Sequence, residues 1–478
     1  MIDTFTIRCN ILHLAFSGKL TIQIEEEGTA QDILNFISEK KSIVSVEEGP
    51  YTIPDSWAWV RLKDLYKINP KVIADNDTAA AFIPMERISG GFDKAFTFEI
   101  QKWEKASKNH TKFEDGDVAF AKITPCFENR KSFIAHDLPN GIGGGTTELI
   151  ILRQKEMLPQ YTYYLVLDQR FITTGTASYK GVVGQQRVQS DVIKDYLVPV
   201  APYSEQKRIV EKIEQVFSVL DTIDELQAQY TDNLSALKSK LIDAAIQGKL
   251  TEQLPEDGTA EEYLKGIEKE KIEIESSGVL KGRKKKKVLS LLNVNFPFEI
   301  PSSWKWIRLN SVAEIFGRIG FRGYTKNDIV EQGKGAISLS PSNITKSGKI
   351  TYESCTYLSW NKYNESPEIM VENEDVILVK TGSSYGKCAI VKSLPEKATI
   401  NPQLAILKYI LCDRNYLHTV LISGMAHKQY EKFVIGAATP TFSQENLANF
   451  LLPLPPLAEQ KRIVQKLEEI LPLCEKLK

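Results

Sequence analysis

The segment TGSSYGKC at 381–388 is the closest approach to a phosphate-binding loop in this 478-residue chain. A nucleotide loop of that kind needs G-x-x-x-x-G-K followed by Ser or Thr, because the hydroxyl holds magnesium. Here the spacing is one residue short and Cys388 replaces the hydroxyl, so we predict a glycine-bearing turn after a strand. GIGGGTT at 141–147 lacks the G-x-G-x-x-G spacing and a clear β-α unit, and we interpret it as a loop.

Other catalytic patterns are also missing. NPK at 69–71 and NPQ at 401–403 lack the second proline and the aromatic residue of the N-P-P-F-type loop expected of an amino-methyltransferase. The five histidines show no metal-ligand spacing, and the six cysteines form no C-x-x-C pair. We therefore expect no catalytic centre, no metal site and no disulfide framework in this chain.

Loops that mix basic, amide and hydroxyl side chains suit a different chemistry, the binding of DNA. Lys and Arg neutralise phosphates, whereas Arg, Lys, Asn, Gln, Ser and Thr read base edges in the major groove. In the first half of the chain the candidates lie at 122–131 and 178–187: Lys122, Thr124, Asn129, Arg130, Lys131, Tyr179, Lys180, Gln185, Gln186 and Arg187. In the second half they lie at 317–326 and 380–387: Arg318, Arg322, Tyr324, Lys326, Lys380, Ser383, Ser384, Tyr385 and Lys387. The alternative for each loop is a solvated surface turn.

The sequence also contains two tryptophan pairs and one basic run. Trp57 and Trp59, like Trp304 and Trp306, are two residues apart and share one face if they lie on a strand. We expect them to pack in the core or between domain and helix, rather than to stack on bases. The run GRKKKK at 282–287 is expected to be a solvated tether, with non-specific phosphate contact as the alternative.

Several motifs occur twice, in the same order, which indicates a tandem duplication of about 230–250 residues. The matched pairs are GKLT at 18–21 and 248–251, IPDSWAW at 53–59 and IPSSWKW at 300–306, EQKRIV at 205–210 and 459–464, and more faintly GDVAFAKI at 116–123 and EDVILVKT at 374–381. The well-matched segments are expected to form a common framework. The divergent stretches 63–195 and 310–447 should then carry different specificities.

A long helix should follow the first copy of the domain. A heptad of apolar residues runs through 203–247 without Pro or Gly, and Gly248 is a suitable stop. The predicted seam consists of Ile209, Ile213, Val216, Leu220, Ile223, Leu234, Leu237 and Leu241, and in the second copy of Ile463, Leu467 and Ile470. At about 1.5 Å per residue the first helix would run roughly 60 Å. The alternative is one amphipathic helix packed on a globular domain.

The second copy of the coil is cut short by the end of the chain, and its missing part lies at the N-terminus. Ile7, Ile11 and Leu14 align with Leu237, Leu241 and Ala244 of the first long helix. The duplication is thus cut inside the coil, a circularly permuted repeat with pseudo-two-fold symmetry. The N- and C-terminal helices together should stand in for one central helix and pack antiparallel along the seam.

We therefore predict an α+β chain in which two mixed α/β recognition domains are separated by two long antiparallel coiled-coil helices. The predicted order is an N-terminal helix at 1–25, a recognition domain at 42–202, a long helix at 203–250, a helix and basic linker at 251–295, a second recognition domain at 296–456 and a C-terminal helix at 457–478.

These motifs resemble the specificity subunits of type I restriction-modification systems. The shared features are the helix start P-L-P-P-x-x-E-Q-x-x-I-V, the repeated G-K-L-T, the stretch EDGTAEEYL at 256–264, the I-P-x-x-W-x-W segments and FIPMERI at 82–88. The resemblance covers nearly the whole chain. It implies a non-catalytic subunit with two target recognition domains, each reading one half of a split, asymmetric DNA site.

The resemblance also implies partners. Two methyltransferase subunits would dock near the helices, and two ATP-dependent restriction-translocation subunits would join them. Adenine N6 methylation would belong to the partners, which would also bind S-adenosylmethionine, ATP and magnesium. The length of the helices would set the number of unread base pairs between the half-sites.

Composition limits the rival functions. Lys plus Arg, 60, nearly equals Asp plus Glu, 61, whereas a stand-alone DNA binder is often basic as a whole. A free-standing DNA-binding regulator is therefore the weaker alternative, and a coiled-coil scaffold or an unrecognised enzyme are weaker still. No signal peptide and no run of 18 apolar residues is evident, so we expect a soluble, cytoplasmic protein.

Overall fold

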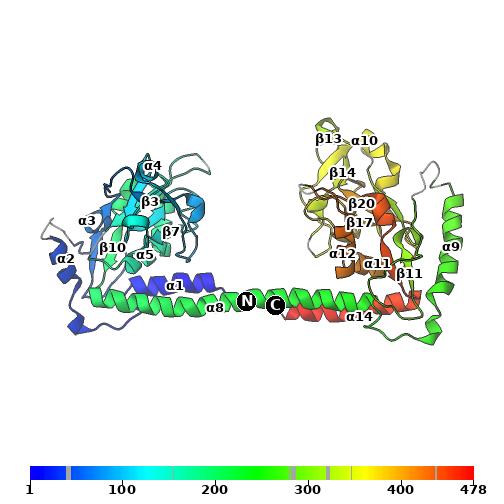
Figure 1. Cartoon of the computed structure of the whole chain (residues 1–478), viewed down its shortest axis with the longest axis horizontal. Coiled ribbons are helices and arrows are strands. Elements are labelled where there is room, and N and C mark those ends of the chain that lie inside the picture. The colour runs from blue at the N-terminus through cyan, green and yellow to red at the C-terminus, as the bar shows by residue number, and fades with distance from the viewer. Residues whose placement is uncertain are drawn as a thin grey trace. The chain divides into compact units, whose positions relative to one another are not determined.

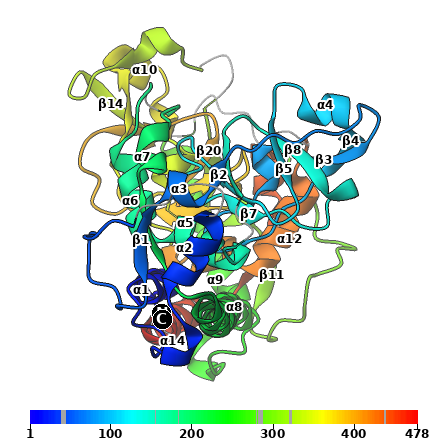
Figure 2. The same cartoon turned by 90° about the vertical axis from the view of Figure 1, so that its left-hand side faces the viewer.

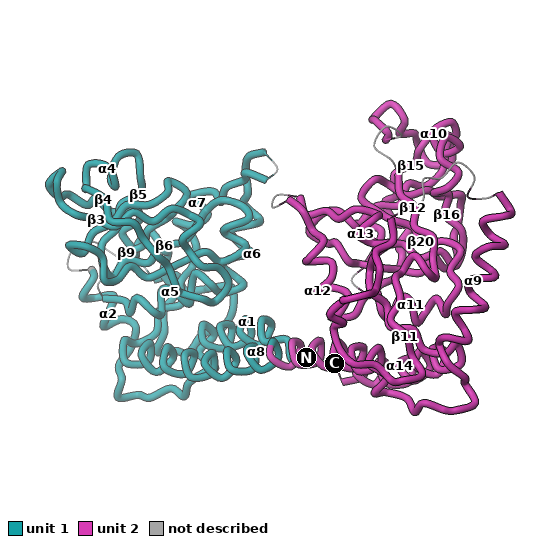
Figure 3. The backbone as a smooth tube through the Cα atoms, turned by 45° about the vertical axis from the view of Figure 1, so that its right-hand side comes forward, with its two compact units in different colours: residues 1–228 teal, residues 229–478 magenta. Residues whose placement is uncertain are grey.

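The computed structural model describes residues 1–38, 45–153, 156–182, 184–278, 280, 287–318, 323–345, 347–436 and 439–477. The chain divides into two compact units, Met1–Ala228 and Gln229–Lys478 (Figure 3). One continuous helix of 44 residues, α8 (Tyr203–Ile246), contains the boundary between them. The heptad pattern predicted this helix, and Gly248 follows its end with a φ of 71°, in the left-handed region that glycine adopts without strain.

In unit 1 the N-terminal helix α1 (Thr4–Phe16) packs antiparallel on the first part of α8 (Figure 1). Thr4 donates to Asp224 over 2.6 Å, while Arg8, four residues later in α1, pairs with Asp221 at 2.5 Å and with Asp224 at 2.9 Å. The order of the partners along the two helices is therefore opposite. Between the helices the apolar side chains are buried, including Leu12 and Phe16.

In unit 2 the C-terminal helix α14 (Leu457–Lys476) packs antiparallel on the last part of α8 (Figure 1). Lys238 pairs with Glu475 at 3.1 Å, and the Tyr230 hydroxyl donates to the Leu477 carbonyl. The predicted antiparallel pairing of matching helices is thus present in each unit.

The predicted seam residues are mostly covered. Ile209, Ile213, Leu220, Leu234, Ile463 and Leu467 are buried, and Val216, Ile223, Leu241 and Ile470 are half-buried. Leu237 differs, because 43% of its surface is exposed. A single partner helix covers only a narrow stripe of α8, and Leu237 lies at the margin of that stripe.

The rest of unit 1, from residue 45 to 202, is an α+β domain, here called domain 1. Its first and last strands, β1 (Ala58–Arg61) and β10 (Leu197–Val200), form an antiparallel ribbon with Trp59 opposite Pro199. Two four-stranded sheets follow, in the orders β2-β9-β6-β7 and β4-β3-β8-β5, and only the β3–β8 pair among them is parallel. The strands are β2 (Lys67–Ile68), β3 (Ala79–Ile83), β4 (Glu99–Lys102), β5 (Thr111–Glu114), β6 (Val118–Ala121), β7 (Ser132–Ile134), β8 (Ile142–Gly145) and β9 (Leu149–Arg153).

The helices of unit 1 flank these sheets, as two views of the chain show (Figures 1 and 2). They are α2 (Ala30–Ser38), α3 (Leu62–Leu65), α4 (Trp103–Ser107), α5 (Pro159–Leu167), α6 (Gln169–Ala177) and α7 (Ser190–Lys194). The α5 segment is almost wholly buried, with Tyr161 and Leu167 fully covered, because it lies between the β-sheet and the α1–α8 pair.

Unit 2 repeats the plan in domain 2, residues 287–456. The ribbon of β11 (Lys305–Arg308) and β21 (Leu451–Leu454) again places a tryptophan, Trp306, opposite a proline, Pro453. Two sheets follow in the orders β12-β20-β17-β18 and β13-β15-β14-β19-β16. The other strands are β12 (Glu314–Phe316), β13 (Ile329–Val330), β14 (Gly335–Leu339), β15 (Thr356–Ser359), β16 (Met370–Val371), β17 (Val376–Val379), β18 (Cys388–Ile390), β19 (Ala398–Ile400) and β20 (Leu404–Lys408). The helices of domain 2 are α10 (Trp360–Asn364), α11 (Arg414–Leu421), α12 (Gly424–Phe433) and α13 (Gln444–Ala448), and α9 (Ala260–Ser276) precedes the domain.

The faint repeat GDVAFAKI/EDVILVKT marks a buried ion pair in each domain. Asp117 pairs with Arg153 at 2.6 Å, and Asp375 pairs with Lys408 at 3.0 Å. In both domains the same carboxylate also accepts a backbone N–H at 2.8 Å from the residue three positions before it. The motif is therefore structural, since it ties the start of a central strand to the strand beside it.

The two glycine-rich segments differ from each other. TGSSYGKC forms the predicted turn between strands β17 and β18. GIGGGTT was interpreted as a loop, but Ile142–Gly145 form the central strand β8. A Cβ atom on Gly144 would lie 1.9 Å from the Ala106 carbonyl oxygen, so glycine is needed because helix α4 packs directly on the strand.

Candidate nucleic-acid interface

The position of domain 1 on the helices depends on one buried carboxylate. Glu205, in the first turn of α8, is 1% exposed. Its Oε2 accepts the indole N–H of Trp57 at 2.8 Å, and its Oε1 accepts from Thr21 at 3.0 Å and from Gln23 at 2.7 Å. The carboxylate thus joins the helix, the first strand of the domain and the segment after α1. We call this set of contacts the clamp of unit 1.

Unit 2 contains the same clamp, built from the second copies of the same motifs. Glu459 is also 1% exposed, and its Oε2 accepts the Trp304 indole N–H at 2.8 Å. Its Oε1 accepts from Thr251 at 3.1 Å and from Gln253 at 2.9 Å. These bonds explain why EQKRIV, GKLT and IPxSWxW recur together.

The next residue of EQKRIV also has one role in both units. The Gln206 side-chain amide accepts the Leu158 N–H at 3.1 Å and donates to the Ala201 carbonyl at 2.9 Å. Gln460 makes the equivalent bonds, to the Asp413 N–H at 2.9 Å and to the Pro455 carbonyl at 2.9 Å. Each domain is therefore held to its helix through backbone as well as side-chain groups.

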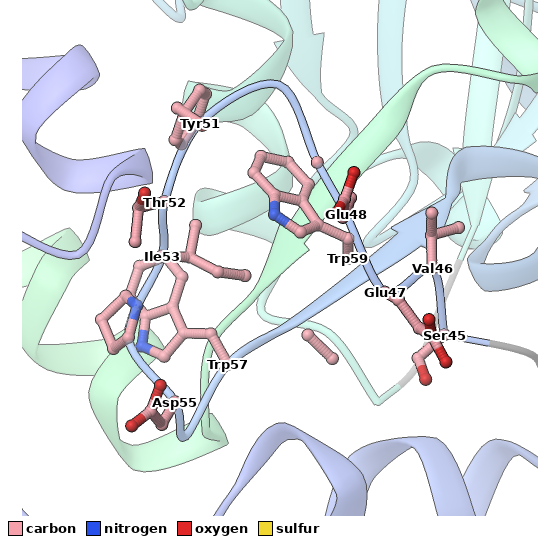
Figure 4. Close-up of a pocket in the computed structure, with 13 residues that line it drawn as sticks. Ser45, Val46, Glu47, Glu48, Tyr51, Thr52, Ile53, Asp55, Trp57 and Trp59 are labelled. Atoms are coloured by element: carbon pink, nitrogen blue, oxygen red, sulfur yellow. The ribbon is translucent and has the colours of Figure 1, made fainter.

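The tryptophans are buried in the core or between domain and helix, as predicted: Trp57 and Trp304 bond to Glu205 and Glu459 of the helices, and Trp59 and Trp306 pack on aromatic rings. Trp57 and Trp59 are 6% and 4% exposed, and both line the inner wall of an open hollow of about 510 Å³ formed by residues 45–59 (Figure 4). Gly18 completes this junction, because a Cβ atom there would lie 2.4 Å from the Pro54 ring. These indoles are engaged within the fold and do not present a stacking face.

The two predicted DNA loops of domain 1 lie side by side. Lys180 and Ile123 both form bridges with Arg187. The Thr124 N–H donates to the Gln186 carbonyl at 2.9 Å, and the Val188 N–H donates to the Lys122 carbonyl at 2.9 Å. Loops that are about 50 residues apart in the sequence therefore form one surface, here called loop pair 1.

Loop pair 1 presents polar and basic groups to the outside. Asn129, Lys180, Gln185 and Arg187 are exposed, and Lys122, Thr124, Lys131, Tyr179 and Gln186 are half-buried. Arg187 donates from Nε and Nη2 to the two carboxylate oxygens of Glu148, at 2.9 and 2.8 Å. These hydrogen bonds hold the pKa of Glu148 below its ordinary value. The ionised carboxylate in turn fixes the position of the Arg187 guanidinium.

Two of the predicted contact residues lie inside their domains instead. Arg130 is 5% exposed, donates to the Leu167 carbonyl at 3.0 Å and to Gln169 at 2.6 Å, and lies over the Phe5 ring of α1. Arg318 is 4% exposed and donates to the Ile400 carbonyl at 3.1 Å. Burial lowers the pKa of both guanidinium groups. Their placement favours a role in holding the domains together.

Domain 2 has a loop pair on the same frame, here called loop pair 2. Thr381 and Ile435 both form bridges with Thr441, and the Phe442 N–H donates to the Lys380 carbonyl at 3.1 Å. Lys380 therefore corresponds to Lys122, and Thr441 corresponds to Arg187. Of the residues predicted here, Ser383 is exposed, and Lys380, Ser384, Tyr385 and Lys387 are half-buried.

The remaining candidates of domain 2 come from the segment 317–326. Lys326 is exposed, and Tyr324 is half-buried with its ring under the Arg318 guanidinium. Arg322 lies outside the described residues, as does most of the basic run 282–287. Among the described residues of this set, Lys326 is the exposed side chain.

Three further residues belong to the loop pairs although no sequence motif marks them. Glu148 and Gln403 occupy equivalent places, because their carbonyls accept the N–H groups of Lys122 and Lys380 at 2.8 and 2.9 Å. Thr441 is the counterpart of Arg187. Aligning the two copies backwards from their shared proline segments, 197–202 and 451–456, would have indicated 439–443 as the second arm of loop pair 2.

Within the described ranges no group of three or more His, Cys, Asp or Glu side chains is placed to hold a metal ion. In the same part of the chain, no helix combines the length and the apolar character that a bilayer crossing needs.

The profile of the type I restriction modification DNA specificity domain matches the chain twice, over residues 54–229 and 301–477. The chain belongs to this family. Each match begins at the proline before the tryptophan pair and includes one domain and its following helix segment, which is the repeat described above. The chain is a DNA-specificity subunit, and in this family that subunit recognises DNA and is not catalytic.

Individual relatives support the assignment. The EcoAI and EcoEI specificity subunits of type I restriction enzymes, both from Escherichia coli, are each 29% identical to this chain. Each alignment covers 98% of this chain and 89% of the relative. A solved chain from a study of complex assembly and conformational transition of the type I R-M system matches with a TM-score of 0.62 at 19% identity, over 90% of this chain and 93% of that one. This last likeness concerns the fold.

Proposed function

We propose that domains 1 and 2 each read one half of a bipartite, asymmetric DNA site. The observation that carries the proposal is that loop pairs 1 and 2 have one frame and different side chains. The backbone bonds from the Val188 N–H to the Lys122 carbonyl and from the Phe442 N–H to the Lys380 carbonyl are equivalent. Arg187 of loop pair 1, however, is replaced by Thr441 in loop pair 2. A constant frame with unlike side chains suits two domains that read unlike sequences.

The helices supply the second part of the proposal. Each clamp fixes a domain to its own helix pair through a buried carboxylate, Glu205 or Glu459. The length of α8 would then set the spacer between the half-sites. We also propose that two methyltransferase subunits dock on the helical part and that two restriction-translocation subunits complete the complex in the cytoplasm.

Catalysis would belong to those partners. S-adenosylmethionine, ATP and magnesium would be bound by the methyltransferase and translocation subunits, and adenine N6 would be the methylated atom. This division is consistent with the near-zero net charge of −1, because a subunit that shares its hold on DNA needs only local positive surface.

One experiment tests the proposed function. The chain is co-expressed with the methyltransferase subunit of its system in a host without other adenine methylation, and methylated adenines are mapped across the genome. We expect co-purification and one split motif with a fixed spacer. Specific DNA binding by the chain alone, without a methylated motif in the presence of the partner, would instead identify a free-standing regulator.

A further inference from the structure

Positions 148 and 187 of domain 1 are equivalent to positions 403 and 441 of domain 2. The equivalence rests on backbone contacts alone: Arg187 and Thr441 each bridge both arms of their loop pair, and the Glu148 and Gln403 carbonyls each accept the N–H of the matching lysine. The frame is the same, but the chemistry is an ion pair in domain 1 and two uncharged side chains in domain 2.

The Arg187 guanidinium is held in a defined orientation at the surface. An arginine has five N–H donors in one plane. Among the described residues, Nε and Nη2 each donate one N–H to Glu148, at 2.9 and 2.8 Å, and Nη1 donates one to the Gln185 carbonyl at 3.3 Å. The side chain is nevertheless 46% exposed. Two N–H groups, one on each terminal nitrogen, therefore remain for an acceptor outside the described chain.

The two remaining donors define the class of ligand. The donors of a guanidinium lie in one plane, and a group with two acceptors on one planar edge can bind a donor on Nη1 and a donor on Nη2 together. In the major groove, guanine presents such an edge through O6 and N7, and its pairing with arginine is the commonest specific contact. A phosphate can also accept two such N–H groups, and the experiment below distinguishes a base contact from a phosphate contact by its dependence on DNA sequence.

We propose that Arg187 reads a guanine in the half-site of domain 1 and that Glu148 is its positioning residue. The proposal rests on the proposed function, because it assumes that loop pair 1 faces DNA. At the equivalent position of domain 2, the Thr441 hydroxyl is within 2.7 Å of the Thr381 hydroxyl and offers no pair of N–H donors. Domain 2 therefore reads its half-site without this contact.

The neighbouring lysines suit contact with phosphates, whereas Arg187 suits contact with a base. Lys180 is exposed and forms a bridge with Arg187, and Lys122 is half-buried and accepts the Val188 N–H through its carbonyl. Lysine is a flexible point charge and suits phosphate contact rather than planar base reading. Arg187 differs from both because its orientation is fixed by a carboxylate.

The test compares Arg187→Thr, which installs the domain 2 residue, with the wild-type chain in the methyltransferase complex. Binding is measured on DNA in which every position of the mapped motif is varied in turn. We expect the preference for guanine at one position of one half-site to fall about 10-fold or more. Preferences at the other half-site should be unchanged. Glu148→Gln should weaken the preference at that same position. The neutral Gln side chain has one acceptor oxygen and cannot form both charge-assisted hydrogen bonds with Arg187.

Arg61→Thr is the matched control. Arg61 is also 46% exposed and pairs with an acid, Asp195, at 3.3 Å, but it lies on the β1–β10 ribbon outside loop pair 1. We expect it to leave every base preference unchanged. If Arg187→Thr weakens binding equally for all sequences, Arg187 contacts phosphate and the proposal is wrong. It is also wrong if Arg187→Thr leaves the motif and its preferences as they were.

Failure of this inference can be told apart from failure of the proposed function. The wild-type complex provides that distinction, because a split methylation motif for the wild type supports the specificity role whatever the variants do. If the wild-type complex methylates no defined motif, the proposed function fails first. Thermal unfolding of each variant confirms that a changed preference does not come from a loss of folding.

Discussion

Trp57 donates its indole N–H to Glu205 across 2.8 Å, and this bond joins the start of domain 1 to the first turn of α8. The acceptor is buried and also serves Thr21 and Gln23. Burying a carboxylate costs free energy because the group loses its hydration. Several hydrogen-bond donors are needed to compensate for that loss. The relationship recurs between Trp304 and Glu459, so the same arrangement holds both domains.

Replacing Glu205 with Ala should destabilise unit 1 by about 3 kcal/mol, because the buried Trp57 indole N–H and the part-buried bonds from Thr21 and Gln23 lose their acceptor. Urea denaturation measures the loss, and hydrogen exchange locates it. Exchange should accelerate in the β1–β10 ribbon and stay unchanged in the β11–β21 ribbon. Glu459→Ala should give the mirror result, whereas Glu211→Ala, on the exposed side of α8, should change stability by less than about 0.5 kcal/mol.

Asn129 and Arg130 are neighbours with opposite expected roles. Arg130→Ala should cost about 2–3 kcal/mol of stability, because its side chain is buried, its bond to the Leu167 carbonyl is buried and its bond to Gln169 is part-buried. Asn129→Ala should leave the unfolding midpoint unchanged, since the side chain is exposed, and should weaken binding to the cognate DNA about fivefold or more. Fluorescence anisotropy and thermal unfolding separate the two. Normal stability of Arg130→Ala combined with lost DNA specificity would reverse the assignment.

The ion pair between Arg462 and Asp257 makes part of the stability of unit 2 depend on pH. Arg462 donates to both carboxylate oxygens, at 2.8 and 2.5 Å, and these bonds hold the pKa of Asp257 below its ordinary value of 3.8. Because the folded pKa is below the unfolded one, the pair stabilises the fold above the unfolded pKa. That stabilisation is lost as the pH falls through the folded value.

Arg462→Met should therefore lower the urea midpoint at pH 7, and the difference from wild type should shrink below about pH 4. Urea titrations between pH 3 and 7 measure this. Lys466→Met is the control, because it removes only a half-exposed pair with Glu469 at 3.2 Å and should have little effect at any pH. A difference that stays constant with pH would contradict the linkage.

The stretch 225–231 of α8 offers a test of the spacing role. In unit 1 the pairing with the N-terminal segment ends where Ile2 meets Gln227, and in unit 2 the pairing with α14 begins at Tyr230. Seven residues inserted there would lengthen the helix by about 10 Å, about three base pairs of DNA. Methylation mapping should show a longer spacer and unchanged half-sites. An unchanged spacer would contradict the ruler mechanism.

The framework was predictable because it is written twice. EQKRIV, GKLT and IPxSWxW marked the starts of α8 and α14 and the antiparallel pairing of the helices, since each set of clamp bonds needs all three motifs. The heptad likewise predicted α8 to within two residues of its end. Repetition showed which residues form the frame, although it did not show their partners.

Other features could not be predicted from local sequence. Arg130 resembles an exposed loop residue, and its partners at 167 and 169 are brought to it only by the fold. GIGGGTT resembles a loop, because glycine in a buried strand is explained only by the closeness of Ala106. Glu148 was missed because its importance depends on Arg187, which lies far along the chain and meets it only after both loops are placed.

The clamps also bear on how such a chain could acquire new targets. In unit 1 no clamp residue lies between Trp57 and Glu205 in the sequence. In unit 2 no clamp residue lies between Trp304 and Glu459. The residues between them can be exchanged as one cassette without removing a clamp bond. Homologous recombination with one crossover in each of these borders would join a foreign recognition segment to an intact scaffold, so one such exchange would change the DNA sequence that the chain recognises.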